Sequence, residues 1–318
     1  MSLFEPKVAV VLGGGGARGL AHIGVLKVFE EEGIPIHLLA GTSMGAVVAA
    51  LKASLPNCTE CAERIAEFGE SPQFKQDKFK DLQLMSPLHQ DEQGFISTVK
   101  RFYKLGLFFA TTLFTPSYID STQFESDIDQ VIPDIMIEAC RFPLAIVATD
   151  LKSGREVVLT KGPLRKAVQA SSAIAGVFPP VTWDNMELVD GGFVSKVPVE
   201  AALKLGADVV LAVDVSSDLA DSDSFNQTGS SISMRAHAIL AEHAKNGELR
   251  LADVAVRPSV AEFHWADFAS YADIIPKGAE AARKAIPEIK RVLARARWGQ
   301  PFRALRRGRR TLDFRSER

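Results

Sequence analysis

Two kinds of hydrophobic pattern alternate along the first two thirds of the chain. Short uninterrupted apolar runs are typical of strands buried on both faces, and apolar residues at three- and four-residue spacing are typical of amphipathic helices. The predicted strands are residues 7–12, 35–40, 144–149, 155–159, 209–213 and 253–256. The predicted helices are residues 19–32, 44–52, 199–205, 234–250 and 277–296. This alternation predicts an α/β fold with a mainly parallel central sheet and helices on both faces.

Two segments interrupt the alternation and indicate how the chain is divided. Residues 71–118 form a long insertion of mixed polarity, and residues 216–233 are rich in Ser, Asp and Asn, which is typical of loops. We therefore predict a core over residues 7–215, a loop and helices over 216–298 that pack on it, and a tail over 299–318. The 318 residues, 47% hydrophobic and 24% charged, suffice for one large domain.

The charge is distributed unevenly, although the net charge is only −2. From Lys284 to the end, the chain carries 12 Lys and Arg against 3 Asp and Glu. The densest part of this tail contains Arg303, Arg306, Arg307, Arg309 and Arg310. We expect such a tail to support peripheral binding to an anionic membrane, and not to nucleic acid. A frayed, solvated terminus is the alternative.

No segment has the pattern of a signal peptide or a membrane-spanning helix. The apolar run at residues 8–12 is too short for a signal peptide, and no run approaches the roughly 18 residues of a spanning helix. We therefore expect a cytoplasmic protein, with any membrane contact made peripherally at the inner face. The three cysteines, Cys58, Cys61 and Cys140, are too few for a disulfide scaffold and lack a zinc-site pattern, so we predict core or semi-exposed thiols.

The sequence Gly-Thr-Ser-Met-Gly at residues 41–45 is the first candidate for chemistry. It matches the pattern G-x-S-x-G and lies between an apolar predicted strand and a helix rich in small residues. A serine hydrolase exposes its nucleophile in this strand–turn–helix context, because flanking glycines permit the strained turn that the serine occupies. Ser43 is therefore a candidate nucleophile.

A run of glycines at residues 13–19 follows the first predicted strand and leads into the first helix. Backbone N–H groups in such a turn converge at the positive end of a helix and can stabilise an oxyanion. The same residues satisfy the dinucleotide pattern G-x-G-x-x-G, which requires an acidic residue about 20 positions further on. Apolar residues 36–40 and the serine turn occupy that place, so we favour the oxyanion interpretation and expect no cofactor.

Several residues could act as the base that activates Ser43. The candidates are the histidines His237, His243 and His264 and the aspartates Asp150, Asp190 and Asp214, which follow apolar runs. His264 is the best of the histidines, but none lies at a predicted strand end. Asp190 precedes two glycines that can expose its carboxylate, although an ordinary pKa near 4 makes a weak base. His22 is close to the glycine run, and we expect it to pack against that loop or to orient it.

Three of these segments together resemble the motif blocks of the patatin-like phospholipase family. Residues 14–19 resemble the block G-G-G-x-R-G, residues 41–45 the block G-x-S-x-G, and residues 190–192 the block D-G-[AG]. Residues 170–181 resemble the segment that the family places before its aspartate. Residues 148–151 and 206–210 resemble the small bacterial members in particular.

The resemblance covers roughly residues 7–215 and implies a three-layer α/β/α architecture with a Ser–Asp dyad that needs no histidine, metal or cofactor. It implies that Ser43 is the nucleophile and Asp190 the base. The amides of Gly14, Gly15 and Gly16 would form the oxyanion hole. The residues that complete the motif blocks are Ala17, Arg18, Gly19, Gly41, Thr42, Met44, Gly45, Gly191 and Gly192.

The implied activity is hydrolysis of a fatty-acyl ester of a phospholipid or lysophospholipid through an acyl-enzyme. Two alternatives stay open: a regulatory or binding protein with little turnover, and a Ser-His-Asp esterase that uses His264. Residues 102–114 are a candidate lid or membrane-docking segment, with a core helix as the alternative. The large apolar side chains behind this hypothesis are Phe102, Leu105, Leu107, Phe108, Phe109 and Leu113.

Overall fold

The uninterrupted apolar runs form the centre of a single β-sheet in the computed structural model, which describes residues 5–71, 115, 117–216 and 229–298. Its strand order is β5-β6-β3-β2-β1-β7-β8, with β4 also paired to β3. The strands are β1 (Val8–Leu12), β2 (Leu38–Thr42), β3 (Leu144–Asp150), β4 (Glu156–Leu159), β5 (Val181–Trp183), β6 (Met186–Asp190), β7 (Val209–Val213) and β8 (Val254–Val256).

The central strands are parallel, as the sequence pattern predicts. β1 pairs in parallel with β2 and β7, β2 with β3, and β7 with β8. β4 and β6 run antiparallel to β3, and β5 runs antiparallel to β6. Short turns join β3 to β4 and β5 to β6, and such turns permit only antiparallel hairpins.

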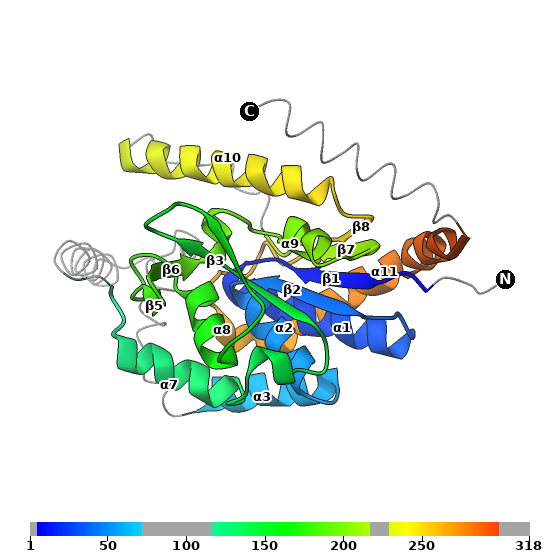
Figure 1. Cartoon of the computed structure of the whole chain (residues 1–318), viewed down its shortest axis with the longest axis horizontal. Coiled ribbons are helices and arrows are strands. Elements are labelled where there is room, and N and C mark those ends of the chain that lie inside the picture. The colour runs from blue at the N-terminus through cyan, green and yellow to red at the C-terminus, as the bar shows by residue number, and fades with distance from the viewer. Residues whose placement is uncertain (1–4, 72–114, 116, 217–228, 299–318) are drawn as a thin grey trace, which may run out of the picture.

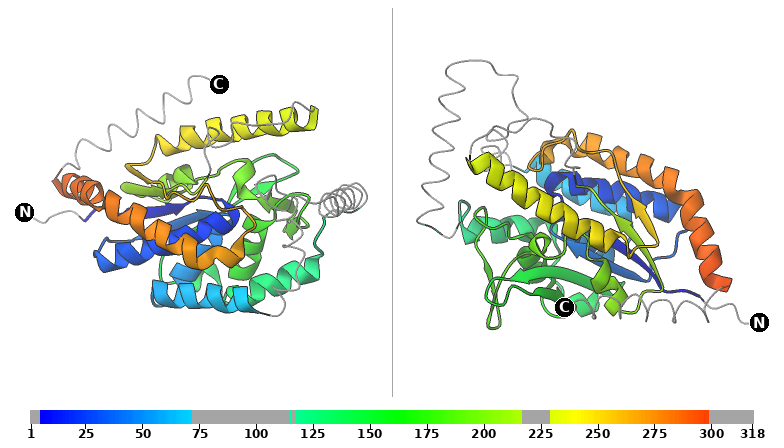
Figure 2. Two further views of the ribbon diagram at one scale, coloured as in Figure 1. Left: turned by 180° about the vertical axis from the view of Figure 1, so that it is seen from behind. Right: turned by 90° about the horizontal axis from the view of Figure 1, so that it is seen from above.

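Helices cover both faces of the sheet, so the three-layer α/β/α architecture is confirmed (Figure 1). One face carries α1 (Ala21–Glu31), α2 (Met44–Ser54), α3 (Cys58–Glu70), α7 (Ser121–Val131), α8 (Leu164–Ser172) and α11 (Tyr271–Trp298). The other face carries the short α9 (Val199–Lys204) and the end of the long α10 (Gly229–Leu249). Seen from behind in Figure 2, α11 runs alongside α1, with which it makes extensive contact.

The structure differs from the predicted elements in a few places. β2 begins at Leu38, three residues after the predicted start, and α11 begins at Tyr271, so Pro276 lies inside the helix. A 3₁₀ turn at Gly16–Leu20 precedes α1. The helices α3, α7 and α8 and the strands β5 and β6 have no counterpart among the predicted elements.

Two predicted segments, residues 102–114 and the basic residues 303–310, lie outside the described residues. Within the part of the chain that is described, no helix is both long and apolar enough to cross a membrane. The cysteines are confirmed as free thiols, with Cys58 and Cys61 buried and Cys140 partly buried.

Candidate active site

Ser43 occupies a sharp turn between β2 and α2. Its backbone has φ 55° and ψ −128°, and a positive φ is rare and strained for a residue other than glycine. The strand ends at Thr42 and the helix begins at Met44, so the serine stands alone at the corner. This is the geometry by which a nucleophile elbow holds its serine oxygen clear of the backbone.

Close contact between α2 and the end of β1 makes this turn possible. A β-carbon on Gly45 would lie 2.0 Å from the carbonyl oxygen of Leu12 and 2.7 Å from that of Gly13. Both are backbone atoms that cannot rotate away, so only glycine fits at this position. The second glycine of the G-x-S-x-G motif therefore lets α2 start directly against the sheet.

The register of strand β3 brings Ser43 and Asp190 together. β4 occupies one edge of β3, so β2 and β6 share the other edge. β2 ends with Thr42 opposite Val147, and β6, running in the other direction, ends with Asp190 opposite Ala148. The two strands thus meet end to end, and the residue that follows Thr42 lies beside Asp190.

Asp190 is almost completely buried and faces the serine. Its Oδ1 accepts the N–H of Gly192 at 2.7 Å, and the hydroxyl of Ser43 lies close enough to the carboxylate to lower its pKa. Burial nevertheless raises the pKa of Asp190 to about 6, against the effects of the Ser43 hydroxyl, the Gly192 N–H and the charge of Lys196. A carboxylate with this pKa is a better match for general-base chemistry near neutral pH than one with a pKa near 4.

The glycine loop lies directly over Ser43. A β-carbon on Gly14 would lie 3.2 Å from Cβ of Ser43. However, the N–H of Gly14 donates to the carbonyl oxygen of Lys196 at 2.9 Å, so the prediction that Gly14 supplies an oxyanion-hole donor needs correction. Within the described residues, the amides of Gly15 and Gly16 make no hydrogen bond, and they remain the candidate donors.

The other motif residues hold the surrounding loops. Ala17 N–H donates to Trp265 O at 2.6 Å, and Arg18 Nε donates to Phe263 O at 2.7 Å. Gly19 packs against Met44, Thr42 Oγ1 donates to the carbonyl oxygen of Ser195, and Gly41 packs against the first turn of α2. The carbonyl oxygen of Gly191 accepts the N–H of Ser195 at 2.9 Å.

The glycine loop is also held from beneath by His22. The ring nitrogen Nε2 of His22 lies 2.8 Å from the carbonyl oxygen of Gly13, as expected for a residue that orients the loop. Burial lowers the pKa of His22 to about 4, so the ring is neutral near physiological pH and donates from Nε2 to this carbonyl.

The rival bases have other partners. The carboxylate of Asp150 accepts Ser153 Oγ at 2.6 Å and closes the turn after β3, and Asp214 forms an ion pair with Lys245. His237 and His243 lie on the exposed face of α10. His264 is buried, and its Nδ1 accepts the N–H of Ala266 at 3.3 Å. Of the candidates, Asp190 is the one that the structure brings against the Ser43 hydroxyl.

An apolar pocket opens beside Ser43. Its walls come from the helices α2, α3 and α7, from the 3₁₀ turn before α1, and from the segments that follow α8 and precede α11. The apolar residues that line it are Leu20, Met44, Val47, Ile65, Phe68, Phe124, Ile128, Val131, Ile174, Phe178, Trp265 and Phe268. Phe124 and Phe178 stack with ring centroids 3.9 Å apart. The sequence interpretation missed these walls, although the apolar spacing in residues 121–131 is a helical signal.

Metal ligands do not gather in this region. Among the described residues, no group of three or more His, Cys, Asp or Glu side chains is arranged to hold a metal ion.

Comparisons with known proteins agree with the motifs. A sequence model described as patatin-like phospholipase matches residues 10–203. Patatin-like phospholipase domain-containing protein 6 of Homo sapiens is 32% identical over 228 residues, which cover 71% of this chain and 14% of that protein. Lysophospholipase NTE1 of Mycosarcoma maydis is 34% identical over 212 residues, which cover 66% of this chain and 10% of that protein. This chain thus spans a small part of the length of these relatives.

Among solved structures, VipD from Legionella pneumophila aligns with 90% of this chain and 67% of its own, at 14% identity and a TM-score of 0.44.

A serine on a strained strand-to-helix turn over a mainly parallel sheet defines an α/β protein with a nucleophile elbow. Within this class, the chain belongs to the patatin-like phospholipase family, because the family model matches more than half of its residues.

Proposed function

We propose that this protein is a serine hydrolase of fatty-acyl esters, with Ser43 as the nucleophile and Asp190 as the base. One observation carries the proposal: the Ser43 hydroxyl faces a buried carboxylate at the mouth of an apolar pocket. The names of the relatives, phospholipase and lysophospholipase, support a lipid ester as the substrate class.

In the first half of the proposed reaction, Ser43 Oγ attacks the ester carbonyl carbon and its proton passes to Asp190. The amides of Gly15 and Gly16 stabilise the oxyanion of the tetrahedral intermediate. The intermediate then collapses, the alcohol leaves with the proton from Asp190, and an acyl-serine is formed. Water attacks the acyl-serine while Asp190 takes its proton, and release of the fatty acid returns this proton to Ser43.

The pocket supports a substrate with one long acyl chain beside the scissile ester. Burial of a chain is favourable by about 0.8 kcal/mol for each CH₂ group, so an apolar pocket of this kind selects lipids over short esters. The pocket and the lysophospholipase relative together favour a lysophospholipid, whose single acyl chain the pocket would receive.

The direct test compares the wild-type protein with Ser43→Ala. We expect the wild type to hydrolyse a medium-chain p-nitrophenyl ester and lysophosphatidylcholine and to be labelled by a fluorophosphonate probe. Ser43→Ala should be neither active nor labelled, because the oxygen that forms the acyl-enzyme is gone. Ser54→Ala, at the far end of α2, is the matched control and should behave like the wild type. A folded wild type that neither labels nor turns over would favour the regulatory or binding alternative.

The acyl-pocket assignment makes a separate prediction. Ile65 is buried in the pocket wall on α3, so Ile65→Trp should fill part of the pocket. We expect kcat/KM for a long-chain ester to fall by at least about tenfold, because several CH₂ groups lose their burial, while the value for an acetyl ester changes little. The control Glu67→Trp adds the same bulk on the exposed face of α3. An equal fall for both esters would contradict the assignment.

A further inference from the structure

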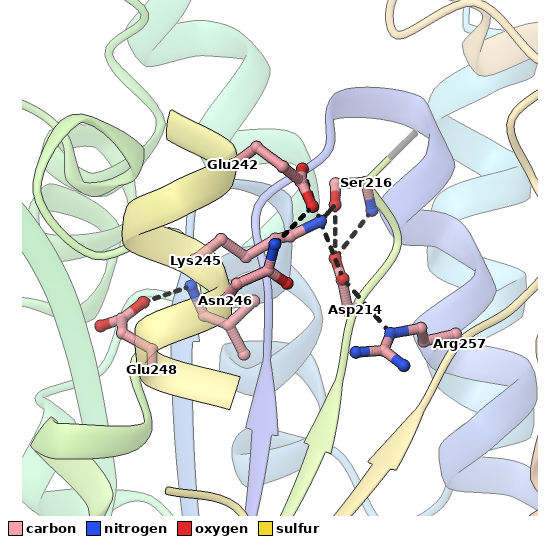
Figure 3. Close-up of polar contacts among 8 residues, drawn as sticks. Asp214, Ser216, Glu242, Lys245, Asn246, Glu248 and Arg257 are labelled. Atoms are coloured by element: carbon pink, nitrogen blue, oxygen red, sulfur yellow. Dashed lines mark hydrogen bonds and ion pairs between the residues drawn. The ribbon is translucent and has the colours of Figure 1, made fainter. Parts of the chain in front are cut away.

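The end of α10 lies close to α9 (Figure 1), whereas the earlier turns of α10 are largely exposed. Leu249 belongs to the core on its face of the sheet, but Leu240, farther from the end, is 69% exposed. Two charged side chains near the end of the helix, Lys245 and Glu248, point inward on opposite sides of the helix (Figure 3). Neither residue belongs to a motif block that the sequence analysis identified.

The carboxylate of Glu248 holds the loop that follows Asp190. Its oxygen Oε1 accepts the hydroxyl of Ser195, and Oε2 accepts the N–H of Val197 at 3.1 Å. Ser195 itself is 2% exposed. Glu248 therefore fixes both ends of the three-residue segment 195–197.

This segment touches all three parts of the candidate site. The carbonyl oxygen of Ser195 accepts Thr42 Oγ1 at 2.9 Å, from the residue directly before the nucleophile. The carbonyl oxygen of Lys196 accepts the N–H of Gly14, in the glycine loop, at 2.9 Å. The N–H of Ser195 donates to the carbonyl oxygen of Gly191, next to the candidate base. The segment thus connects the nucleophile turn, the glycine loop and the Asp190 turn.

A buried ion cluster fixes the helix that carries Glu248. The ammonium of Lys245, 1% exposed, contacts Asp214 at 3.2 Å, Glu242 at 2.8 Å and Ser216 Oγ at 2.7 Å (Figure 3). Asp214 directly follows β7, and Arg257 approaches it from beyond β8 at 3.9 Å. Because a buried charge is stable only when it is paired, this cluster ties α10 to the carboxyl end of the sheet.

We propose that Glu248 is a positioning residue, which sets the geometry of the nucleophile turn and the oxyanion loop by holding the segment 195–197. The inference rests on the proposed function of Ser43 and extends it. Glu248 contacts neither Ser43 nor the pocket, so its effect is transmitted through Thr42 and Gly14. Shifts of about 1 Å in such a site lower turnover strongly, because the attack geometry is exacting.

We call the two hydrogen bonds by which Glu248 holds the segment 195–197 the bracing. Both oxygens of Glu248 accept a hydrogen bond in this arrangement, as an ionised carboxylate does. Burial raises the pKa of Glu248 to about 7, and the charges of Glu156 and Glu200 act in the same direction. Lys204 on α9 forms ion pairs with both of these carboxylates, at 3.0 and 3.7 Å. The bracing is therefore complete above this pKa and weakens as the pH falls through it.

The experiment compares Glu248→Gln with the wild type. Gln keeps the shape and can still accept the N–H of Val197, but its NH₂ group then faces Ser195, so the Ser195 hydroxyl can no longer donate to a charged oxygen. We expect kcat to fall by at least about tenfold with little change in KM, because the pocket is untouched. The dependence of kcat on pH should change as well, because Gln does not titrate. In the Gln variant, the fall of kcat at acidic pH should shift to lower pH, towards the pKa of Asp190, about 6. Glu280→Gln, at an exposed ion pair on α11, is the control.

Hydrogen exchange measured by mass spectrometry gives a readout that needs no turnover. In Glu248→Gln we expect faster exchange in residues 13–20 and 191–198, with the other core strands unchanged and the melting temperature within about 3 °C of the wild type. Unchanged exchange and unchanged kcat, or a fall in kcat without faster exchange in these loops, would overturn the proposal. A wild type without hydrolase activity would refute the proposed function, and the exchange result would still decide the bracing.

Discussion

Replacing Asp190 with Asn is expected to lower kcat/KM for ester hydrolysis by about 10³-fold, because general-base catalysis typically contributes 10² to 10⁴. Asn is nearly isosteric, and its Oδ1 can still accept the N–H of Gly192 that Asp190 accepts at 2.7 Å. The Asn side chain cannot take the proton of Ser43, so the nucleophile would stay a neutral hydroxyl. Steady-state hydrolysis and the rate of fluorophosphonate labelling would both measure the loss.

The alternative base makes the opposite prediction. If His264 activated the serine, His264→Ala would abolish turnover and Asp190→Asn would leave much of it. We expect His264→Ala to retain most activity, since the Ser43 hydroxyl faces Asp190. A large loss in the His264 variant, with a folded protein and an active Asp190→Asn variant, would contradict the Ser–Asp dyad.

The elevated pKa of Asp190 also predicts opposite pH dependences for activity and stability. Activity needs the ionised carboxylate, so the contribution of Asp190 to kcat/KM should fall as the pH drops through about 6. Stability follows the reverse sign: the folded state holds the proton more tightly than the unfolded chain, so ionisation of Asp190 destabilises the fold as the pH rises from about 4 to 6. Asp190→Asn should therefore unfold at a higher temperature than the wild type near neutral pH.

The parallel strands and the helices next to the motifs could be predicted because their signals are local. The apolar run at residues 8–12 and the spacing of Leu20, Ile23, Leu26 and Phe29 each indicate an element without reference to the rest of the chain. The serine turn has a local signal too, since glycines flank it and a helix of small residues follows. For these reasons β1, α1 and α2 agree closely with their predicted ranges.

The arrangement of the candidate site depends on pairing that no short window contains. Ser43 and Asp190 meet because β2 and β6 share one edge of β3, and this register is set by pairing between strands far apart in the sequence, such as Ala40 with Ala145 and Ala148 with Asp190. The hydrogen bond from Gly14 to Lys196 also joins residues that are far apart in the sequence. A prediction from the motif alone could not foresee it, and therefore counted Gly14 among the free amides. The family resemblance supplied the pairing of serine and aspartate that the residues alone left open.

For the pocket walls, the sequence signal is present but does not tell a pocket from a solid core. α3 and α7 have clear amphipathic spacing, yet their apolar faces give no indication of whether they line a pocket or a solid core. Only the packing of Ile65 and Phe124 around the space beside Ser43 distinguishes the two. Glu248 has no sequence signal at all, because a helix of mixed polarity gives no reason to single out one acidic residue.

Gly45→Ala is expected to be the most destabilising single change near the site. The added β-carbon would lie 2.0 Å from the carbonyl oxygen of Leu12, far inside the contact distance of real side chains. Relief requires α2 to move away from β1, which would pull Ser43 from Asp190 and open the core. We expect a loss of more than about 4 kcal/mol in the free energy of unfolding, measured by urea denaturation, together with loss of fluorophosphonate labelling.

Gly247→Ala provides the matched control for this prediction, since it makes the same change inside α10, where nothing lies within 4 Å of the added carbon. Ala has the higher helix propensity, so this variant should gain about 0.5–1 kcal/mol or stay unchanged. If Gly45→Ala unfolded like the control and kept its labelling, α2 could shift without disturbing the serine turn. The nucleophile turn would then be held by the hydrogen bonds of Thr42 and Ser43, at 2.9 Å to Ser195 and Ser171, and not by the close packing of helix on strand.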